Sequence, residues 1–295
     1  MSLRVGLIPA RSKPDAQALA REMAPWLDSR GCEVLDEETL VRTGTLPDVL
    51  VTLGGDGLIM RVAHIFPDIP VLGINVGRVG FLAMIERQRW RDALTALIRG
   101  EYRIQESPTL TAVLRRGQHV EAEEWAINDV VIRSGLQMID VEVYIDGLFV
   151  NTYPGDGMIV ATPQGSTAYC MAAGGPVLAA GVGGFAVTPI CAHSPIRTTL
   201  VVPEEATVDL VLATERDASL ILDGAPLLSL AREDVIRVHR GDHRFRLIYL
   251  DGMNFYQAFR SKFNFLIRPD AKPTLRPPDL GDAARVPAGR GPSGE

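Results

Sequence analysis

The sequence has few cysteines, and this excludes two kinds of site. Only three occur in 295 residues, Cys32, Cys170 and Cys191, and they lie far apart without Cys-x-x-Cys spacing. A disulfide framework and a structural zinc site both need closely patterned cysteines. We therefore expect reduced thiols and a cytoplasmic protein.

Long apolar runs and surplus positive charge are also missing. The amino terminus is too short in its apolar run for a signal peptide, and no later stretch approaches the roughly 20 residues that cross a bilayer. The chain has 30 Lys and Arg against 36 Asp and Glu, a net charge of −6. Sequence-independent binding to nucleic acid needs an excess of basic residues. We expect neither a membrane nor a nucleic acid as partner.

Enough apolar residues are present for two hydrophobic cores. The chain is 46% hydrophobic and 22% charged, which is typical of a soluble globular protein. Up to about residue 105, short apolar runs alternate with helical spacing, as in the run 3–8 and the helical pattern over 15–27, which Pro25 would end early. This alternation predicts a parallel sheet with helices on its faces.

The texture changes after Ser107-Pro108. Short alternating runs are separated by turn signals, of which Asp146-Gly147 is the clearest, and this pattern predicts antiparallel strands. Strands are expected at 235–239 and 245–250, and a helix over 255–262. We predict an α/β domain over residues 1–105, completed by roughly 253–267, and a β-rich domain over 106–252. Residues 268–295 are rich in Pro and Gly and lack aromatics, which favours a disordered tail.

One stretch near the amino terminus is typical of a phosphate-handling turn. The apolar run Val49 to Leu53 leads into Gly54, Gly55, Asp56 and Gly57, and a helix is expected over 58–65. Glycine amides can approach an anion closely, and the start of a helix favours negative charge. A carboxylate there either holds a metal ion or accepts a proton from an attacking hydroxyl. The alternative is that Asp56 only caps the helix.

A second glycine-rich stretch runs from Pro154 to Pro176. The pattern predicts a strand over 158–161, a turn over 163–165 and a short helix capped by Ser166. Backbone amides, a hydroxyl and the ring of Tyr169 fall within one turn, which suits a nucleotide. A tightly packed turn and helix without a ligand is the alternative.

Six motifs in order resemble those of the NAD kinases, and the likeness extends over almost all of residues 3–265. Gly-Gly-Asp-Gly alone also occurs in diacylglycerol and sphingosine kinases, so the order of the series carries the resemblance. The motifs are Gly54 to Gly57, Asn75 to Leu82, Asn128-Asp129, Gly155 to Tyr169, Thr188 to Ser194, and Phe255-Tyr256 to Phe265.

The resemblance implies a fold, a reaction and an assembly. The fold would be an amino-terminal Rossmann-like α/β domain and a carboxy-terminal β-sandwich-like domain that binds the dinucleotide, with the site in the crevice between them. The reaction would transfer the γ-phosphate of the co-substrate ATP to the 2′-hydroxyl of the adenosine ribose of NAD, giving NADP. A divalent metal ion, Mg²⁺, would take part, although no protein ligand to it is assigned. A homodimer or homotetramer would contribute to each site across subunits.

The same resemblance assigns roles to residues at the first turn and at residue 128. Asp56 would be the general base, Gly54 and Gly55 would form the phosphate loop, and Gly57 would lie against the substrate. Arg61 matches a dinucleotide-contacting position, with a solvated helix face as the alternative. Asn128 and Asp129 would bind ribose hydroxyls and adenine, because vicinal hydroxyls need acceptors and an adenine edge suits an amide.

Further along the chain, other positions match substrate-contacting residues of the family. Asp156 would address the nicotinamide half of the substrate, although Asp is also common in such turns. Asp223-Gly224 matches a position near the substrate or forms a hairpin turn. The adenine and nicotinamide pockets would be lined by Thr167, Ala168, Tyr169, Cys170, Met171 and Ala172.

Some positions depart from the family pattern and keep other functions open. Leu58 stands where Thr is usual, and Ala172 and Ala225 stand where polar residues are common. These changes motivate a dinucleotide-binding sensor with little catalysis as the second hypothesis. A lipid kinase is the third. Formation of NADP from ATP and NAD would separate the first two, since a sensor would bind NAD without turnover.

Overall fold

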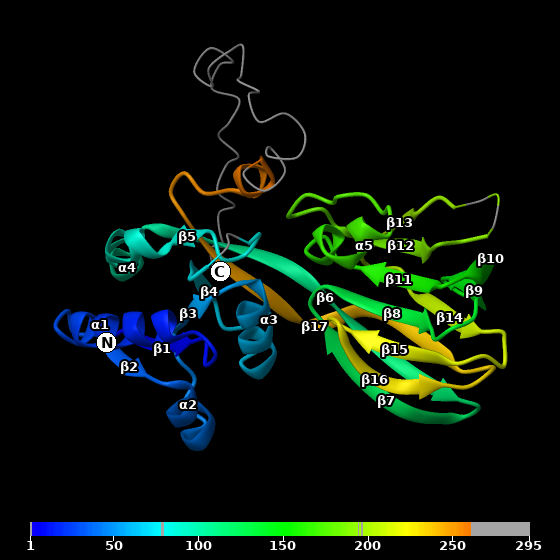
Figure 1. The fold of residues 1–295 in the computed structure, drawn as a ribbon, viewed down its shortest axis with the longest axis horizontal. Helices are drawn as coiled ribbons and strands as arrows, with labels where there is room; N and C mark the ends of the chain where they lie inside the picture. Colours follow the sequence, from blue (N-terminus) through cyan, green and yellow to red (C-terminus); the bar gives the residue numbers. More distant parts are fainter. Residues whose placement is uncertain (1, 78–79, 194, 196, 261–295) are drawn as a thin grey trace, which may run out of the picture.

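The computed structural model describes residues 2–77, 80–193, 195 and 197–260. Its first half alternates strands and helices, as the sequence predicts, and adds a short helix α2 that the pattern does not reveal (Figure 1). The elements of this half are β1 (Arg4–Pro9), α1 (Pro14–Asp28), β2 (Glu33–Leu35), α2 (Glu37–Thr43), β3 (Val49–Gly54), α3 (Asp56–Ile65), β4 (Val71–Asn75), β5 (Ile85–Glu86), a 3-10 turn (Arg87–Arg89) and α4 (Trp90–Arg99).

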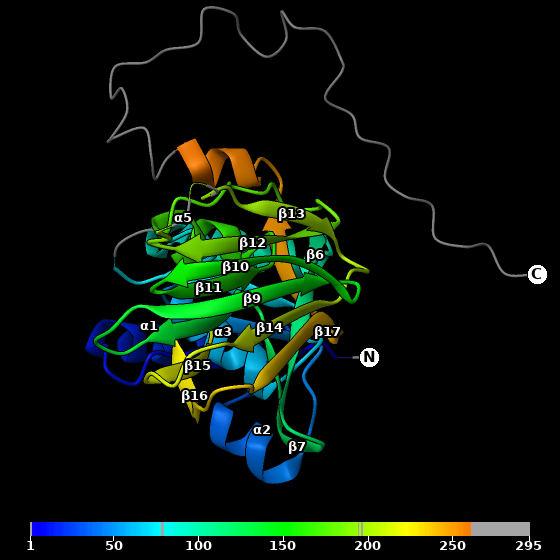
Figure 2. The same ribbon diagram turned by 90° about the vertical axis from the view of Figure 1, so that its right-hand side faces the viewer.

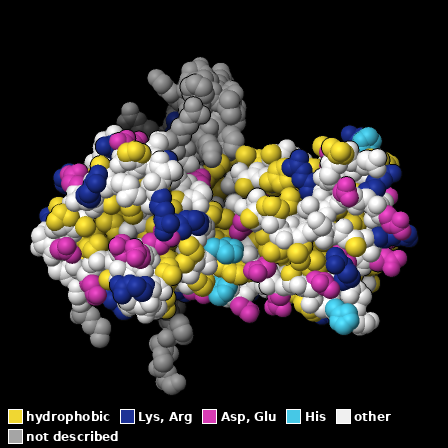
Figure 3. Space-filling view, turned by 60° about the horizontal axis from the view of Figure 1, so that its bottom comes forward, with side chains coloured by type: hydrophobic (Ala, Val, Ile, Leu, Met, Phe, Trp, Pro, Cys, Tyr) yellow, Lys and Arg dark blue, Asp and Glu magenta, His cyan; other side chains and the backbone are white. Residues whose placement is uncertain are grey.

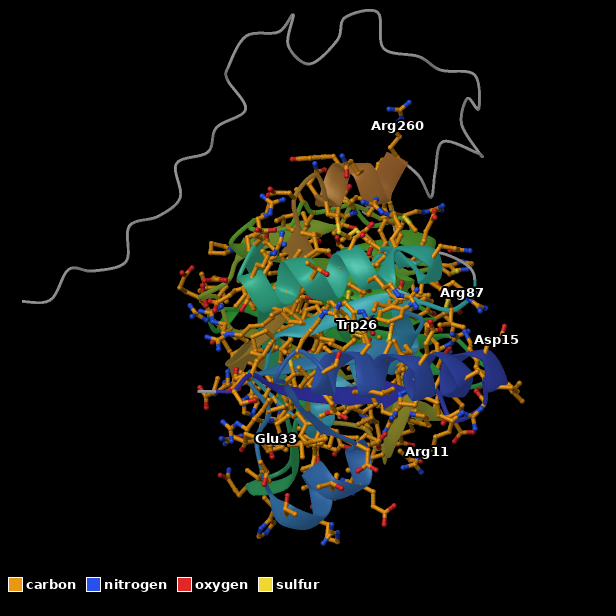
Figure 4. All side chains as sticks on the ribbon, turned by 90° about the vertical axis from the view of Figure 1, so that its left-hand side faces the viewer. Arg11, Asp15, Trp26, Glu33, Arg87 and Arg260 are labelled. Carbon is orange, nitrogen blue, oxygen red and sulfur yellow. The ribbon has the colours of Figure 1, made fainter. Side chains whose placement is uncertain are left out.

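The strands of the first half form a parallel sheet in the order β2-β1-β3-β4. Helices α1 and α4 cover one face, where Trp26 of α1 lies between the two helices and meets Trp90 edge to face (Figure 4). Helices α2 and α3 cover the other face, with Leu40 and Ile59 in its core. Because α/β sheets bind ligands at the carboxyl ends of their strands, the end of β3 is the expected site.

Helix α1 continues through Pro25 to Asp28, so the expected early end is wrong. Pro25 lies in the last turn of the helix, so the backbone hydrogen bond that it removes weakens only the end of the helix. In the described residues, no helix is long and apolar enough to cross a bilayer.

The second half is built from strands, with a short helical segment after β11 (Figure 2). Its elements are β6 (Tyr102–Arg116), β7 (His119–Ala126), β8 (Asp129–Ser134), β9 (Ile139–Ile145), β10 (Leu148–Gly155), β11 (Gly157–Ala161), a 3-10 turn (Gly165–Thr167), α5 (Tyr169–Ala172), β12 (Gly184–Ile190), β13 (Leu200–Pro203), β14 (Val208–Leu212), β15 (Ala218–Leu222), β16 (Ala225–Leu230) and β17 (Val235–Leu250).

Two sheets pack face to face in this half and form a β-sandwich. One has the order β13-β12-β11-β8-β15-β16, and β10, β9, β14, β17 and β6 supply the other. The core between them includes Ile132, Val160, Phe185, Leu210 and Ile236. The predicted fold class, a Rossmann-like α/β part and a β-sandwich-like part, is confirmed.

Strands β6 and β17 join the two halves (Figure 1). The two strands expected at 235–239 and 245–250 are one strand, β17, which carries an irregularity between Arg240 and Arg244. Leu247 of β17 pairs in parallel with Val71 of β4, so one sheet continues from the α/β part into the sandwich. The division into two domains near residue 105 stays a prediction. Residues 255–260 are helical; the rest of the expected helix and the predicted tail lie outside the described residues.

Candidate functional site

Asp56 is the first residue of α3 and binds a distant segment of the chain. Its Oδ2 accepts a hydrogen bond from the backbone N–H of Phe81 at 2.7 Å. Its Oδ1 accepts two more, from Leu82 at 3.0 Å and Ala83 at 3.1 Å. The carboxylate therefore fixes the segment after β4 against the glycine turn that ends β3.

Gly80 is needed for this contact because of the space it leaves. A Cβ atom at Gly80 would overlap the carboxylate of Asp56. The glycine of the Asn75 to Leu82 motif thus has a direct physical role, which is to let the chain pass close to the carboxyl group.

A cavity of about 800 Å³ opens beside Asp56, between α3 and the sandwich. The first half contributes Asp56, Gly57, Arg61 and other residues of α3, together with Phe81 and Leu82. The second half contributes the remaining wall, which includes Glu124, Trp125, Asn128, Thr167, Ala168, Asp223 and Leu227. A cavity of this size and mixed lining suits a small organic ligand with a few polar groups.

A second cavity of about 560 Å³ lies on the other side of the glycine turn. It is lined by Arg11, Ser12 and Lys13 of the loop after β1, and by Gly55, Gly57, Leu58 and Arg61. Arg11 lies at the end of α1 that carries Asp15 (Figure 4). The lining combines three basic side chains with the N-terminal end of α3, a combination that favours an anion.

The segment 127–129 is held in the same way as the segment 81–83. Asp223 accepts hydrogen bonds from the backbone N–H groups of Ile127 at 2.8 Å, Asn128 at 2.6 Å and Asp129 at 3.1 Å. Asp223 and Gly224 both have positive φ angles, 49° and 81°, in the turn between β15 and β16. The hairpin-turn interpretation of Asp223-Gly224 is confirmed, and Asp223 of this turn lines the cavity, whereas its position near the substrate stays a prediction.

Burial raises the pKa values of two neighbouring carboxyl groups, those of Asp129 and Asp223. Burial, and then the nearby charge of Asp223, raises the pKa of Asp129 to about 7. Burial also raises the pKa of Asp223, against the opposing effect of its three N–H donors and of His64. Buried carboxyl groups close to one another disfavour the charged form, so Asp129 exchanges its proton near neutral pH.

Aromatic and histidine side chains form the outer wall of the first cavity. His64 of α3 stacks on Trp125 with ring centroids 4.1 Å apart and planes 4° apart, and His243 lies on Trp125 at 4.8 Å. His64 Nδ1 is 3.9 Å from the carboxylate of Asp223. Figure 3 shows histidine and acidic side chains gathered near the middle of one face. The stacking of His64 on Trp125 connects α3 to strand β7 of the second half.

A third cavity of about 340 Å³ adjoins the first and includes more of the predicted residues. Asn128, Ala168 and Asp223 line both cavities, and Asp129 and Tyr169 line the third. The Arg133 guanidinium lies over the Tyr169 ring, 5.5 Å from its centroid. The predicted residues that line one or both of these two neighbouring cavities are thus Asp56, Gly57, Arg61, Asn128, Asp129, Thr167, Ala168 and Tyr169.

Other predicted residues do not line these three cavities. Cys170 is fully buried, and its Sγ lies 3.2 Å from Thr188 Oγ1. Met171 and Ala172 follow on α5, and Gly54 is buried at the end of β3. Asp156 is exposed and directly precedes β11, at the other end of this strand from Ala161, which pairs with Asp129.

Sequence reasoning missed Met60, His64, Trp125 and Glu37. Met60 and His64 follow Asp56 at intervals of four residues, so the helical repeat alone places them on the same face of α3. Trp125 precedes the Asn128 motif by three residues. Glu37 gave no such signal, because its contact with Arg61 depends on how α2 packs beside α3.

Comparison with known proteins gives the family. The model of the ATP-NAD kinase N-terminal domain matches residues 41–102, and that of the ATP-NAD kinase C-terminal domain matches residues 127–250. A curated NAD kinase of Thermomicrobium roseum is 60% identical over 276 residues, which cover 94% of this chain and 96% of that protein. The chain belongs to the NAD kinase family.

More distant relatives extend the same likeness. The NAD kinase of Moorella thermoacetica is 36% identical over 88% of both chains. Two solved structures share the fold of this family member. A yeast NADH kinase complexed with NADH has a TM-score of 0.81 at 21% identity and covers 93% of this chain and 90% of its own. An NAD kinase from Archaeoglobus fulgidus in complex with ATP has a TM-score of 0.70 at 24% identity, over 89% and 98% of the two chains.

Proposed function

We propose that this chain is an NAD kinase that transfers the γ-phosphate of ATP to the 2′-hydroxyl of the adenosine ribose of NAD, with Asp56 as the general base. Family membership supports the two substrates and the reaction. The observation that supports the assignment of Asp56 is the meeting of two cavities at its turn. Gly57 and Arg61 line both cavities, and Asp56 lines the larger one.

In this proposal the larger cavity binds the dinucleotide and the smaller one binds the phosphates of ATP. The larger cavity has the apolar and aromatic surface that a base or nicotinamide ring needs, and Asn128 and Asp129 stand beside it to bind polar edges. The smaller cavity has Arg11, Lys13 and the start of α3. Phosphoryl transfer requires the acceptor and donor to lie in line, and a shared wall allows that arrangement.

The hydrogen bonds of Asp56 leave capacity for a substrate hydroxyl. A carboxylate offers about four lone-pair positions. Three of them accept the N–H groups of residues 81–83, two on Oδ1 and one on Oδ2. One position on Oδ2 remains for the 2′-hydroxyl, and the three amides hold that oxygen in a fixed direction.

A divalent ion, Mg²⁺, fits this proposal as a partner of ATP. In the described part of the chain, no group of three or more His, Cys, Asp or Glu side chains is placed to hold a metal ion. Mg²⁺ commonly binds through substrate phosphates with few protein ligands, and it would neutralise charge that develops on the transferred phosphoryl group.

We also propose that a second copy of the chain completes each site in a homodimer or homotetramer. In the pairing of β11 with β8, Ala161 lies opposite Asp129 and Gly157 opposite Arg133. Asp156 therefore lies roughly 16 Å along the strand from Asp129, at about 3.3 Å per residue. A role for Asp156 at the nicotinamide half fits a residue supplied by a partner subunit. Light scattering of the wild type, together with the Michaelis constant for NAD of Asp156→Ala, tests this. We place the enzyme in the cytoplasm, in keeping with its three free cysteines.

The decisive experiment compares wild type with Asp56→Asn in the presence of ATP, Mg²⁺ and NAD. We expect NADP formation by the wild type and a loss of about 10²–10⁴-fold in the variant, the usual contribution of a general base. NAD binding, measured by calorimetry, should change little.

Asp146→Asn is a matched control, because the Asp146 carboxylate, like that of Asp56, accepts a hydrogen bond from a distant backbone N–H, here that of Thr207, but Asp146 lines neither cavity. It should leave turnover unchanged. A wild type that binds NAD without making NADP would support the sensor instead.

A further inference from the structure

Arg61 stands at the wall shared by the two cavities, and a residue outside both of them orients it. Its guanidinium forms a bidentate pair with Glu37, the first residue of α2, with Nη1–Oε1 at 2.6 Å and Nη2–Oε2 at 2.8 Å. We propose that Glu37 is a positioning residue that holds Arg61 for binding the phosphate groups of the substrates. The inference rests on the proposed function, because it takes NAD and ATP as the ligands of the two cavities.

The geometry of this pair differs from that of an ordinary surface ion pair. Most exposed pairs contribute little, since both side chains are free to move in water. The Glu37 side chain is only 14% exposed, whereas that of Arg61 is 41% exposed. A bidentate guanidinium–carboxylate pair fixes the plane of the guanidinium as well as its position. The less exposed partner, Glu37, is therefore the anchor, and the more exposed one, Arg61, lines the cavities.

Arg61 keeps donors for a ligand while it is held. A guanidinium has five N–H groups, and the two hydrogen bonds to Glu37 use two of them. The other three are left for an anionic group at the boundary between the cavities. Lysine could not replace arginine here, because an ammonium lacks the planar fork that serves a carboxylate and a phosphate together.

Arg11 adds a second cation to the same carboxylate. Its Nη2 lies 3.6 Å from Glu37 Oε1, and its side chain is 79% exposed. The hydrogen bonds and charge of Arg61, together with the charge of Arg11, lower the pKa of Glu37 against the opposing effect of burial. With two cations on one carboxylate, the cluster keeps a net positive charge toward the second cavity, which Arg11 and Arg61 both line.

The test is a double-mutant cycle on Glu37→Gln and Arg61→Ala in the full-length chain. Glutamine keeps the shape of glutamate but offers one acceptor oxygen and no charge. We expect Glu37→Gln to raise the dissociation constant for NAD about tenfold, as the loss of one charge-assisted hydrogen bond would, with kcat changed less than about twofold. On the Arg61→Ala background the same substitution should have no further effect. Binding of ATP, measured separately, should weaken as well, because Arg61 also lines the second cavity.

Several results would overturn the proposal. One is an equal loss from Glu37→Gln with and without Arg61. Another is a lower melting temperature with unchanged dissociation constants, which is what a purely structural pair gives. The matched control is Glu22→Gln, which removes the ion pair between Glu22 of α1 and Arg91 of α4, both more than half exposed and away from the cavities. Its binding constants should equal those of the wild type.

Failure of the proposed function would remain distinguishable from failure of this inference. A wild type that binds NAD but makes no NADP would exclude the kinase reaction while the binding cycle still reports on Glu37. A wild type that binds neither NAD nor ATP would overturn both.

Discussion

Two turns of this molecule use a carboxylate in the same way but depend on different properties of the chain. Asp56, at the start of α3, accepts three backbone N–H groups from residues 81–83, and Asp223, in the β15–β16 hairpin, accepts three from residues 127–129. Each carboxylate joins a turn to a segment far away in sequence. Together they set the two opposite walls of the 800 Å³ cavity.

The glycines beside the two turns show the difference. Gly80 is required for space, because a Cβ there would overlap the carboxylate of Asp56. A Cβ at Gly224 would meet nothing within 4 Å beyond its chain neighbours, but the φ angle there is 81°, so this glycine is required for backbone conformation. The first turn is limited by close packing at the proposed catalytic group, and the second by the geometry of a hairpin.

Of changes at the two glycines, Gly80→Ala should have the larger effect on the rate. The added methyl group must displace either Asp56 or the segment 81–83, and a small misplacement of a catalytic group slows a reaction strongly. We expect kcat to fall by about 100-fold, measured as NADP formation at saturating ATP and NAD.

Gly224→Ala provides the comparison with the other turn. It should cost about 1 kcal/mol of folding free energy from left-handed backbone strain and leave kcat within about twofold. Equal losses of kcat in Gly80→Ala and Gly224→Ala would contradict the distinction between a turn that depends on close packing and a turn that depends on backbone conformation.

A second effect concerns stability and not the rate. Asp223→Ala leaves three backbone N–H groups without their acceptor in a largely buried place, since the Asp223 side chain is 12% exposed. We expect the free energy of unfolding to fall by about 3 kcal/mol, measured by urea titration. Asp56→Ala should cost less, about 1 kcal/mol, because two of the residues that Asp56 holds, Phe81 and Leu82, line the cavity, where water can replace the lost acceptor. The reverse order would show that the Asp56 turn is the more important for folding.

The sequence was sufficient to predict the parts of this site that depend on local chemistry. The glycine turn with Asp56, the hairpin at Asp146-Gly147 and the two-part fold were foreseen, because turn residues and hydrophobic period act within a few residues. A hairpin at Asp223-Gly224 was one of two interpretations of that pair. Contacts between distant segments were not. The triads of N–H groups at 81–83 and 127–129, and the pair of Glu37 with Arg61, arise only after the sheet brings the segments together.

Strand β17 shows the same limit on a larger scale. Its polar middle, with Arg240, Asp242 and Arg244, interrupts the apolar alternation, so the pattern favours two strands. Pairing with β6 along almost the whole length holds these residues in one strand across the irregularity. Tertiary pairing thus overrides the local signal.

The segment held by Asp223 differs from the segment held by Asp56 in that it contains a carboxyl group with a raised pKa, that of Asp129. Folding raises this pKa from about 3.8 to about 7, by burial and then by Asp223. Between these values the unfolded chain has lost the proton that the folded chain keeps, so stability falls as pH rises from about 4 to 7 and stays low above 7. Asp129→Asn has no titrating group at this position and therefore does not lose stability in this way as pH rises. It should therefore be more stable than the wild type at pH 8, by up to about 4 kcal/mol, and nearly equal to it at pH 4 in urea titrations.

Binding should show the opposite trend in the wild type. In the proposed function a charged Asp129 would accept hydrogen bonds from ribose hydroxyls, whereas a protonated one has lost acceptor capacity. The dissociation constant for NAD should thus rise several-fold as pH falls from 8 to 6, while the protein itself becomes more stable. In Asp129→Asn the binding should be weaker and this part of the pH dependence should vanish. A wild-type affinity that is flat across this range would place Asp129 outside the substrate contacts, and its destabilising burial would then bring no gain in binding.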